Sequence, residues 1–230
     1  MRLNRTVKLM LMLIALFGYG ESQAAPTMEL ENRLEESASV LRGMIQAPDG
    51  SIPADLLKRS SAVMIFPSVI KAGIGVGGHY GKGTILRRDP ATNRWGPPAF
   101  VTFFGGSFGW QVGVQSTQLV LLVMTEVDLK SIFRDKLTIG ADASVAAGPI
   151  GRDASATTDI GLGAGILSYS RAQGLFAGVA IRGSVVEPDW EANEQYYGSD
   201  SSLIDIFFQG KGTASPAGKK LIDLLNRYSS

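Results

Sequence analysis

The stretch PAFVTFFGGSFGWQVGVQSTQLVLLVM, Pro98 to Met124, decides the fold because aromatic and β-branched residues dominate it. From Phe108 to Gln115, apolar residues alternate with glycine or glutamine, which predicts a strand with one buried face. Leu119 to Met124 is an unbroken apolar run, typical of a strand that is covered on both sides. Gly105-Gly106 interrupts the pattern, and we expect a tight reversal there. The stretch therefore predicts two or three consecutive strands at the centre of a sheet.

Segments with helical periodicity lie at both ends of the chain. Met28 to Ile45 repeats apolar residues at intervals of three and four, which predicts a helix docked on the sheet. The alternative is a helix on a membrane surface, but four Glu against two Arg is the wrong sign for anionic lipid. Helices are also predicted for Trp190 to Tyr197, Ser201 to Phe208 and Pro216 to Tyr228, the last with Ser215 as its N-cap. This order predicts an α+β fold with a strongly curled, mainly antiparallel or barrel-like sheet and helices at both ends.

Glycine occupies alternate positions in a second strand-like segment, Lys71 to Thr84. Because glycine weakens a strand, a whole glycine face indicates that another backbone or a ring packs closely there, or that the strand bends sharply. Leu137 to Ala147 alternates apolar with small or polar residues and predicts one further strand. Gly161 to Tyr169 and Leu175 to Val186 predict a hairpin.

The amino terminus has the plan of a secretory signal peptide. Three basic residues precede the apolar run Leu9 to Phe17, and a small-x-small site ends at Ala24. We expect cleavage after residue 24 and a periplasmic or secreted protein. Residues 25–230 then form a single domain, with its core in 60–198 and flanking helices in 27–46 and 200–228. The chain has no cysteine that could carry a lipid at the cleavage site.

The charge of the mature chain excludes one class of partner. Cleavage removes three basic residues and one acidic residue from totals of 22 and 21, which leaves the protein near neutrality. No overall field would then drive nucleic-acid binding. The densest group of basic and aromatic residues is a candidate site for lipid phosphate groups, and it comprises Lys82, Arg87, Arg88, Arg94 and Trp95. The alternative for this group is a solvated edge hairpin.

Two short motifs suggest catalysis but lack the required context. Gly73 to Gly78 matches G-x-G-x-x-G, and Gly105 to Gly109 matches G-x-S-x-G with Ser107 as the nucleophile. Each motif requires a following helix, whereas each is followed here by strand-like sequence, so Ser107 is interpreted as a hairpin-turn serine. His79 is the only histidine available as a base. The aspartates that could bind calcium, Asp142, Asp153 and Asp159, have no regular ligand spacing. We therefore expect no enzyme activity, no cofactor and no metal.

Four blocks of the sequence together resemble the SYLF domain family. They are SAVMIFPSVIKAGIGVGGHYGKGTIL (61–86), FVTFFGGSFGWQVGVQSTQLVLLVMT (100–125), KLTIGADASVAAGPIG (136–151) and LSYSRAQGLFAGVAIRGSVVEPD (167–189), and Tyr196-Tyr197-Gly198 follows them. The resemblance covers nearly all of the mature chain. As an exported, stand-alone version, the chain resembles the bacterial branch of the family. The resemblance implies binding of phosphoinositides or other anionic lipids without catalysis, and a yeast member gave the family an actin-binding label. In eukaryotic members, the segment that matches Met28 to Ile45 is associated with membrane attachment.

The sequence thus predicts a non-enzymatic protein of the cell envelope that binds anionic lipid or a membrane surface. One alternative is a structural or protein-interaction module of the periplasm with an envelope protein as its partner. A second alternative is a serine hydrolase that uses Ser107.

Overall fold

The computed structural model describes residues 24–47, 52–134, 136–149, 163–172, 175–176, 181–198, 201–210 and 212–229. Its helices are α2 (Ala24–Ile45), α3 (Ala54–Arg59), α4 (Glu126–Arg134), α6 (Trp190–Tyr197), α7 (Leu203–Phe208) and α8 (Pro216–Tyr228). Its strands are β1 (Ala62–Arg88), β2 (Trp95–Val123), β3 (Leu137–Thr138), β4 (Val145–Ala147), β5 (Ile166–Ala172), β6 (Leu175–Phe176) and β7 (Val185–Pro188). The helices predicted at both ends are present, and Ser215 caps α8 as expected.

Strands β1 and β2 form one long antiparallel hairpin, in which Ala62 pairs with Val123 and Arg88 pairs with Trp95. Strand β2 continues through Gly105 and Gly106, so the predicted reversal at these residues is wrong. A glycine pair permits a turn but does not require one, and here pairing with β1 keeps the backbone extended. The stretch that decides the fold is therefore one strand and not two or three.

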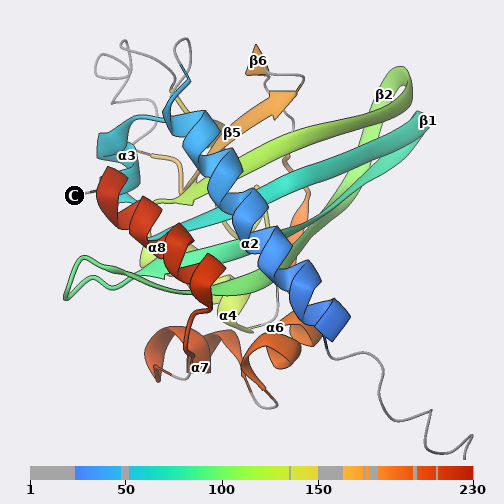
Figure 1. Ribbon diagram of the computed structural model, residues 1–230. Coiled ribbons are helices and arrows are strands. Elements are labelled where there is room, and N and C mark those ends of the chain that lie inside the picture. The colour runs from blue at the N-terminus through green and yellow to red at the C-terminus, as the bar shows by residue number, and fades with distance from the viewer. Residues whose placement is uncertain are drawn as a thin grey trace, which may run out of the picture.

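The middle of this hairpin bends sharply, so that both strands run out to one end of the molecule and return (Figure 1). A Cβ atom added to Gly77 would lie 2.3 Å from the carbonyl oxygen of Ala72. One added to Gly83 would lie 2.4 Å from the carbonyl oxygen of Ile65 and 2.4 Å from the ring of Phe66. The two halves of β1 approach this closely because these positions have no side chain. The prediction of close packing and a sharp bend at the glycine face is confirmed.

The sheet extends from this hairpin on both sides. Its seven strands follow the order β3-β7-β2-β5-β4, with β1 paired to β2 and β6 paired to β5. All pairs between these strands are antiparallel except that of β4 with β5. The predicted α+β class, with a strongly curled and mainly antiparallel sheet, is confirmed.

The segment Leu137 to Ala147 is not the single strand that its alternation predicts. Strand β3 ends at Thr138, whose N–H donates to the carboxylate of Asp142 at 2.6 Å, and Gly140 has φ +88°. Aspartate and glycine stabilise a turn at these positions. The alternation persists because Ile139 and Ala143 are both buried. The hairpin expected after Gly161 forms only between β5 and β6, since β7 pairs with β2 and β3 instead.

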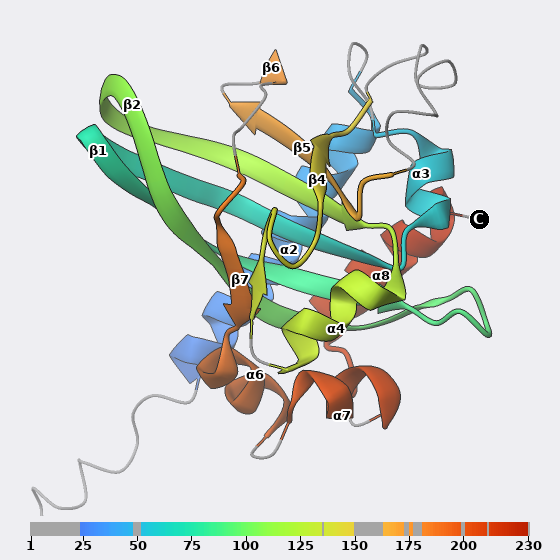
Figure 2. The ribbon, with the colours of Figure 1, turned by 180° about the vertical axis from the view of Figure 1, so that it is seen from behind.

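Helices cover both faces of the sheet (Figures 1 and 2). On one face, α2 and α8 bury a core that includes Leu34, Leu41 and Leu221. On the other face, a second core includes Leu129 of α4 and Ile206 of α7. The apolar side of α2 is thus packed inside the protein, as the docked interpretation predicts. None of the described helices combines the length and apolar character needed to cross a membrane.

Replacing Gly83 with alanine tests the close contact that shapes the hairpin. The new methyl group would overlap the carbonyl of Ile65 and the ring of Phe66, and overpacking of this kind costs about 1–3 kcal/mol. For a protein of this size, we expect Tm to fall by roughly 3–10 °C in thermal unfolding. Gly106→Ala is the matched control, because Gly106 lies in the same hairpin and a Cβ there meets nothing within 4 Å. Equal Tm values for the two variants would contradict the role given to Gly83.

Candidate functional site

The bend of the β1–β2 hairpin projects beyond the helices (Figures 1 and 2), and apolar side chains near it are exposed. The exposed fractions are 49% for Ile70, 66% for Val76, 49% for Tyr80 and 76% for Val114. The pleat places these four residues on the sheet face that α2 covers further along the hairpin. We call these four residues, together with Lys82 on the same face and Lys71 on the opposite face of β1, the bend surface.

The two strands of the hairpin carry positive charge and no carboxylate. Strand β2 contains no charged residue. Strand β1 contains the single histidine, His79, and four basic residues, namely Lys71, Lys82, Arg87 and Arg88. Lys71 is exposed and has no ion pair with a carboxylate of the described residues. Lys82 is half exposed, and its Nζ lies 3.5 Å from Oε1 of Glu29. The bend surface is therefore positively charged as well as apolar.

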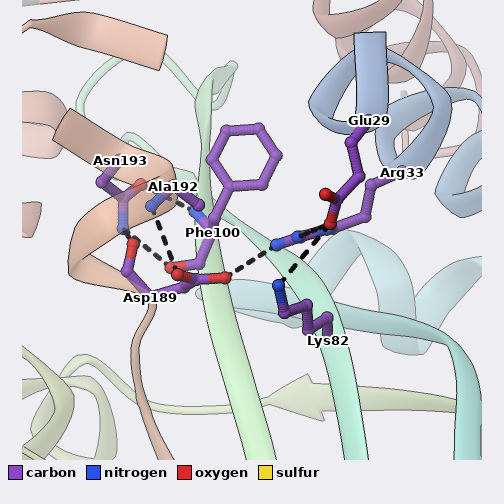
Figure 3. Close-up of polar contacts among 7 residues, drawn as sticks. All are labelled: Glu29, Arg33, Lys82, Phe100, Asp189, Ala192 and Asn193. Carbon is purple, nitrogen blue, oxygen red and sulfur yellow. Dashed lines mark hydrogen bonds and ion pairs between the residues drawn. The ribbon is translucent and has the colours of Figure 1, made fainter. Parts of the chain in front are cut away.

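Lys82 adjoins a polar network that fixes α2 against the sheet (Figure 3). Buried Arg33 donates to Glu29 at 3.0 Å and to Asp189 at 2.9 Å, and its guanidinium carbon lies 5.3 Å from the centroid of the Phe100 ring. The hydrogen bond from Arg33, followed by the charge of Lys82, lowers the pKa of Glu29. Glu29 thus stays negative near neutral pH and offsets part of the charge of Lys82.

The same network joins α6 to β2. The carboxylate of Asp189 accepts from the N–H of Ala192 and caps α6. The side-chain amide of Asn193 both donates to the carbonyl and accepts from the N–H of Phe100, each at 2.8 Å (Figure 3). Asp189 therefore connects α2, through Arg33, with a helix that is itself hydrogen-bonded to β2.

The structure separates Lys82 from the other predicted lipid-binding residues. Lys82 lies on the α2 face of β1, whereas Arg87 contacts Glu126 of α4 at 3.2 Å. The guanidinium carbon of Arg87 also lies 4.1 Å from the ring centroid of Phe208 in α7. Lys82 and Arg87 are an odd number of positions apart in an extended strand, so their side chains take opposite faces.

The remaining three predicted residues lie at the turn between β1 and β2. Trp95 is only 4% exposed, and its Nε1 donates to Ser229, so the structure does not place this ring at a surface. Arg88 donates to the carbonyl of Asn93, and Arg94 is exposed in the turn. Of the five residues, only Lys82 belongs to the bend surface. Sequence reasoning missed Lys71, although the absence of acidic residues from both strands was a signal for it.

Neither catalytic motif has the backbone that its chemistry needs. Ser107 pairs with Gly77 in the middle of β2, so no helix follows it as in a nucleophile elbow, and it is not the turn serine predicted. Gly73 to Gly78 lies within β1, so no helix begins there to hold a pyrophosphate. The expectation that each motif leads into strand is confirmed.

The aspartates considered as calcium ligands do not form a binding group within the residues that the structure describes. Asp142 accepts a hydrogen bond from Thr138 in a turn, while Asp153 and Asp159 lie outside the described residues. No group of three metal-ligating side chains occurs within the ranges that the structure describes.

The single histidine is packed on the sheet face opposite to α2. Its Nε2 lies 2.9 Å from Oγ of Ser184, and its ring stacks on Phe103 with centroids 5.0 Å apart. Burial, together with the nearby charge of Lys71, lowers the pKa of His79. Ser184 is 1% exposed, so the hydroxyl group that His79 contacts is not open to a substrate.

The lowered pKa of His79 predicts a pH dependence of stability. The folded state binds the proton more weakly than the unfolded state, so this stabilisation is complete above about pH 6.5 and is lost as pH falls through the folded pKa. We expect the free energy of urea unfolding to fall more between about pH 7.5 and about pH 5.5 in the wild type than in His79→Gln. An NMR titration gives the pKa directly because the chain has one histidine. A value at or above the ordinary one would contradict this account.

Replacing Arg33 with methionine tests the network that holds α2. The change leaves Asp189 poorly solvated without its cation, and breaking a buried pair in this way costs about 3–5 kcal/mol in the free energy of unfolding. The control is Lys220→Met, which breaks the exposed pair with Glu35 and is expected to cost less than about 1 kcal/mol. Urea unfolding at neutral pH measures both. Similar costs for the two variants would show that Arg33 is not a critical link.

Comparisons with known proteins agree on one family. The family described as Ysc84, Las17-binding protein actin regulator, matches residues 104–228. Protein YSC84 of Saccharomyces cerevisiae is 32% identical over 204 residues, which cover 85% of this chain and 43% of the yeast protein. LAS seventeen-binding protein 3 of the same species is 31% identical over 204 residues, covering 85% of this chain and 44% of that protein. The SH3 domain-containing YSC84-like protein 1 of Mus musculus is 28% identical over 206 residues, which cover 87% of this chain and 60% of the mouse protein.

The chain spans about half the length of these curated relatives. The family match covers more than half of the chain and includes the second half of β2, the strands that follow it and α8. Together with the curved hairpin and the flanking helices, these matches show that the chain belongs to the Ysc84 family, which is the SYLF domain family that its sequence blocks resemble.

Proposed function

We propose that this protein binds the surface of anionic membranes and catalyses no reaction, and that it does so in the cell envelope after loss of residues 1–24. The observation that carries the proposal is the charge of the β1–β2 hairpin. Its strands contain four basic and no acidic residues, and two of the basic residues lie on the exposed bend surface. The ligand class is a lipid with a negatively charged head group, such as a phosphoinositide-like or another anionic lipid.

Local charge matters more than total charge for this kind of binding. The whole chain has a formal net charge of only +1, so its overall field does not attract a membrane. At physiological salt, however, a membrane surface interacts mainly with charges within about 8 Å. A lysine that reaches an anionic leaflet contributes about 1 kcal/mol. We expect Lys71 near the bend and Lys82, next to α2, to make this contribution.

The surroundings of the serine and histidine side chains support a non-enzymatic function. Ser107 lies in a continuous strand, and the only histidine contacts Ser184, which is buried. A hydrolase needs a nucleophile that is both exposed to substrate and bonded to its base. The hydrolase alternative therefore has little support.

Protein interaction is a second candidate function, and a different surface favours it. Val127 in α4 is 70% exposed, and Ile204 and Phe208 in α7 are 45% and 51% exposed. The names of the family and of its yeast relatives refer to binding of Las17 and to actin regulation. An apolar surface on these helices would suit a protein partner.

Vesicle co-sedimentation tests the proposed function. We expect the mature protein to pellet with vesicles of phosphatidylcholine that contain about one-third anionic phospholipid, and to remain in solution with neutral vesicles. Removing the charges in Lys71→Gln/Lys82→Gln should lower the partition coefficient at low salt by roughly thirtyfold, because two lysines at about 1 kcal/mol each contribute about 2 kcal/mol.

The matched control removes the same two charges from another surface. Lys219 and Lys220 are exposed on α8, away from the bend (Figure 1), so Lys219→Gln/Lys220→Gln should bind nearly as the wild type does. No pelleting of the wild type with anionic vesicles at low salt would refute the proposed function. Equal losses in the two double variants would show that binding does not depend on the bend surface.

A further inference from the structure

Helix α2 corresponds to the segment that is associated with membrane attachment in eukaryotic members of the family. In this structure its apolar side is packed in the core and is not available for contact with a bilayer. Most apolar residues of α2 are in the core, with Leu34, Leu41 and Met44 fully buried, and only Met28 at its start is largely exposed among its large apolar side chains that the structure describes. Arg33 and Asp189 add a buried ion pair that fixes the same helix to the rest of the fold. The outer side of α2 carries carboxylates, including Glu29 and Glu35, which are more than half exposed. Apolar contact with a bilayer must therefore come from another surface.

Among the described residues, exposed large apolar side chains occur at the bend, on α4 and α7, and singly at Met28 of α2 and Trp190 of α6, and charge distinguishes these places. Met28 precedes Glu29, and Trp190 lies between Asp189 and Glu191. On α4, Val127 lies between Glu126 and Asp128 in the chain, and on α7, Ile204 precedes Asp205. An anionic surface would be repelled by these carboxylates. At the bend, by contrast, the apolar residues lie on strands that contain only basic charges. An anionic bilayer is thus the partner whose charge and apolar interior both match the bend.

The backbone of the bend also suits partial insertion. Peptide groups that enter an apolar medium must keep their hydrogen bonds. Residues Gly75 to Leu86 of β1 remain paired with β2, with Val76 opposite Phe108 and Tyr80 opposite Phe104, while the register shifts between Gly73 and Gly75. Tyrosine is a residue type that favours the boundary between head groups and acyl chains. The bend is the projecting edge of the sheet, so it can meet a flat surface before the helices do (Figure 2).

We infer that Ile70, Val76, Tyr80 and Val114 form an apolar anchor that enters the boundary between head groups and acyl chains of an anionic bilayer. In an edge-on orientation, Lys82 on the face of the anchor and Lys71 on the opposite face of the bend then lie at the level of the lipid phosphates. This inference rests on the proposed function and adds the site and the mode of contact. Binding would have two components, an electrostatic one that salt weakens and an apolar one that salt leaves in place.

A single-cysteine probe tests insertion directly, because the chain has no cysteine of its own. In Val76→Cys labelled with the environment-sensitive dye NBD, we expect a blue shift and a rise in emission when anionic vesicles are added. Lipids that carry a quencher high in the acyl chain should then reduce this emission. The control position is Val127→Cys, whose side chain is equally exposed but lies on α4. The dye there should respond little.

Polar substitutions test the anchor without a label. Val76→Ser/Val114→Ser alters only exposed side chains, and circular dichroism and Tm check that the fold is intact. At about 0.5 M salt, where charge attraction is strongly screened, we expect this variant to bind anionic vesicles at least about tenfold more weakly than the wild type. Val127→Ser/Ile204→Ser is the matched control and should retain wild-type binding.

The outcomes separate the inference from the proposed function. If the wild type does not bind anionic vesicles at low salt, the proposed function itself fails. If the wild type binds while the dye at position 76 stays in a polar environment and the serine variant binds equally well, only the anchor is refuted. A dye response to actin filaments but not to vesicles would also refute the anchor and assign the bend to a protein partner.

Discussion

The close approach of the two halves of β1 is the constraint on which the rest of the structure depends. Gly77 and Gly83 lie against carbonyl oxygens of the same strand at distances that exclude a Cβ atom. This contact lets a hairpin of two very long strands bend back on itself, so that one hairpin supplies most of the curled sheet. It also determines where the sheet is covered, because α2 and α8 cross the returning halves and leave the bend outside both cores.

Sequence patterns predicted the elements whose signals are local. The N-cap and apolar stripe of α8, the periodicity of α2 and the glycine face of β1 all have the expected structures. The two errors in strand boundaries have a common physical origin. Gly105-Gly106 permits either a reversal or an extended strand, and only the pairing with β1 selects the strand. Between Leu137 and Ala147, burial on one side keeps the alternation of a strand even though Gly140 and Asp142 form a turn.

The candidate site was harder to predict because proximity in sequence is not proximity on a surface. Lys82, Arg87 and Trp95 lie within fourteen residues of one another, yet they contact α2, α4 and the end of α8 respectively. Strand alternation explains the separation of Lys82 from Arg87, and the burial of Trp95 follows from its packing beside Ser229. Lys71 and Lys82 lie on opposite faces of β1, and the register shift between Phe66 and Val69 changes which positions face α2. A pattern that spans both strands, namely the absence of carboxylates, was the better guide to the site.

The position of α2 limits how the protein can meet an anionic surface. The apolar side of α2 packs into the core, and the ion pair between Arg33 and Asp189 fixes the helix in this orientation. The carboxylates of α2 therefore lie on its outer side, over the face of the sheet that α2 and α8 cover. Contact through that broad face would bring Glu29 and Glu35 toward the lipid phosphates, and like charges would oppose it. Contact through the edge of the bend keeps Glu35 away from the phosphates and presents Lys71 and the exposed apolar residues, while Glu29 remains beside Lys82 and offsets part of its charge. The same interactions that close the core therefore favour an edge-on orientation over a face-on one.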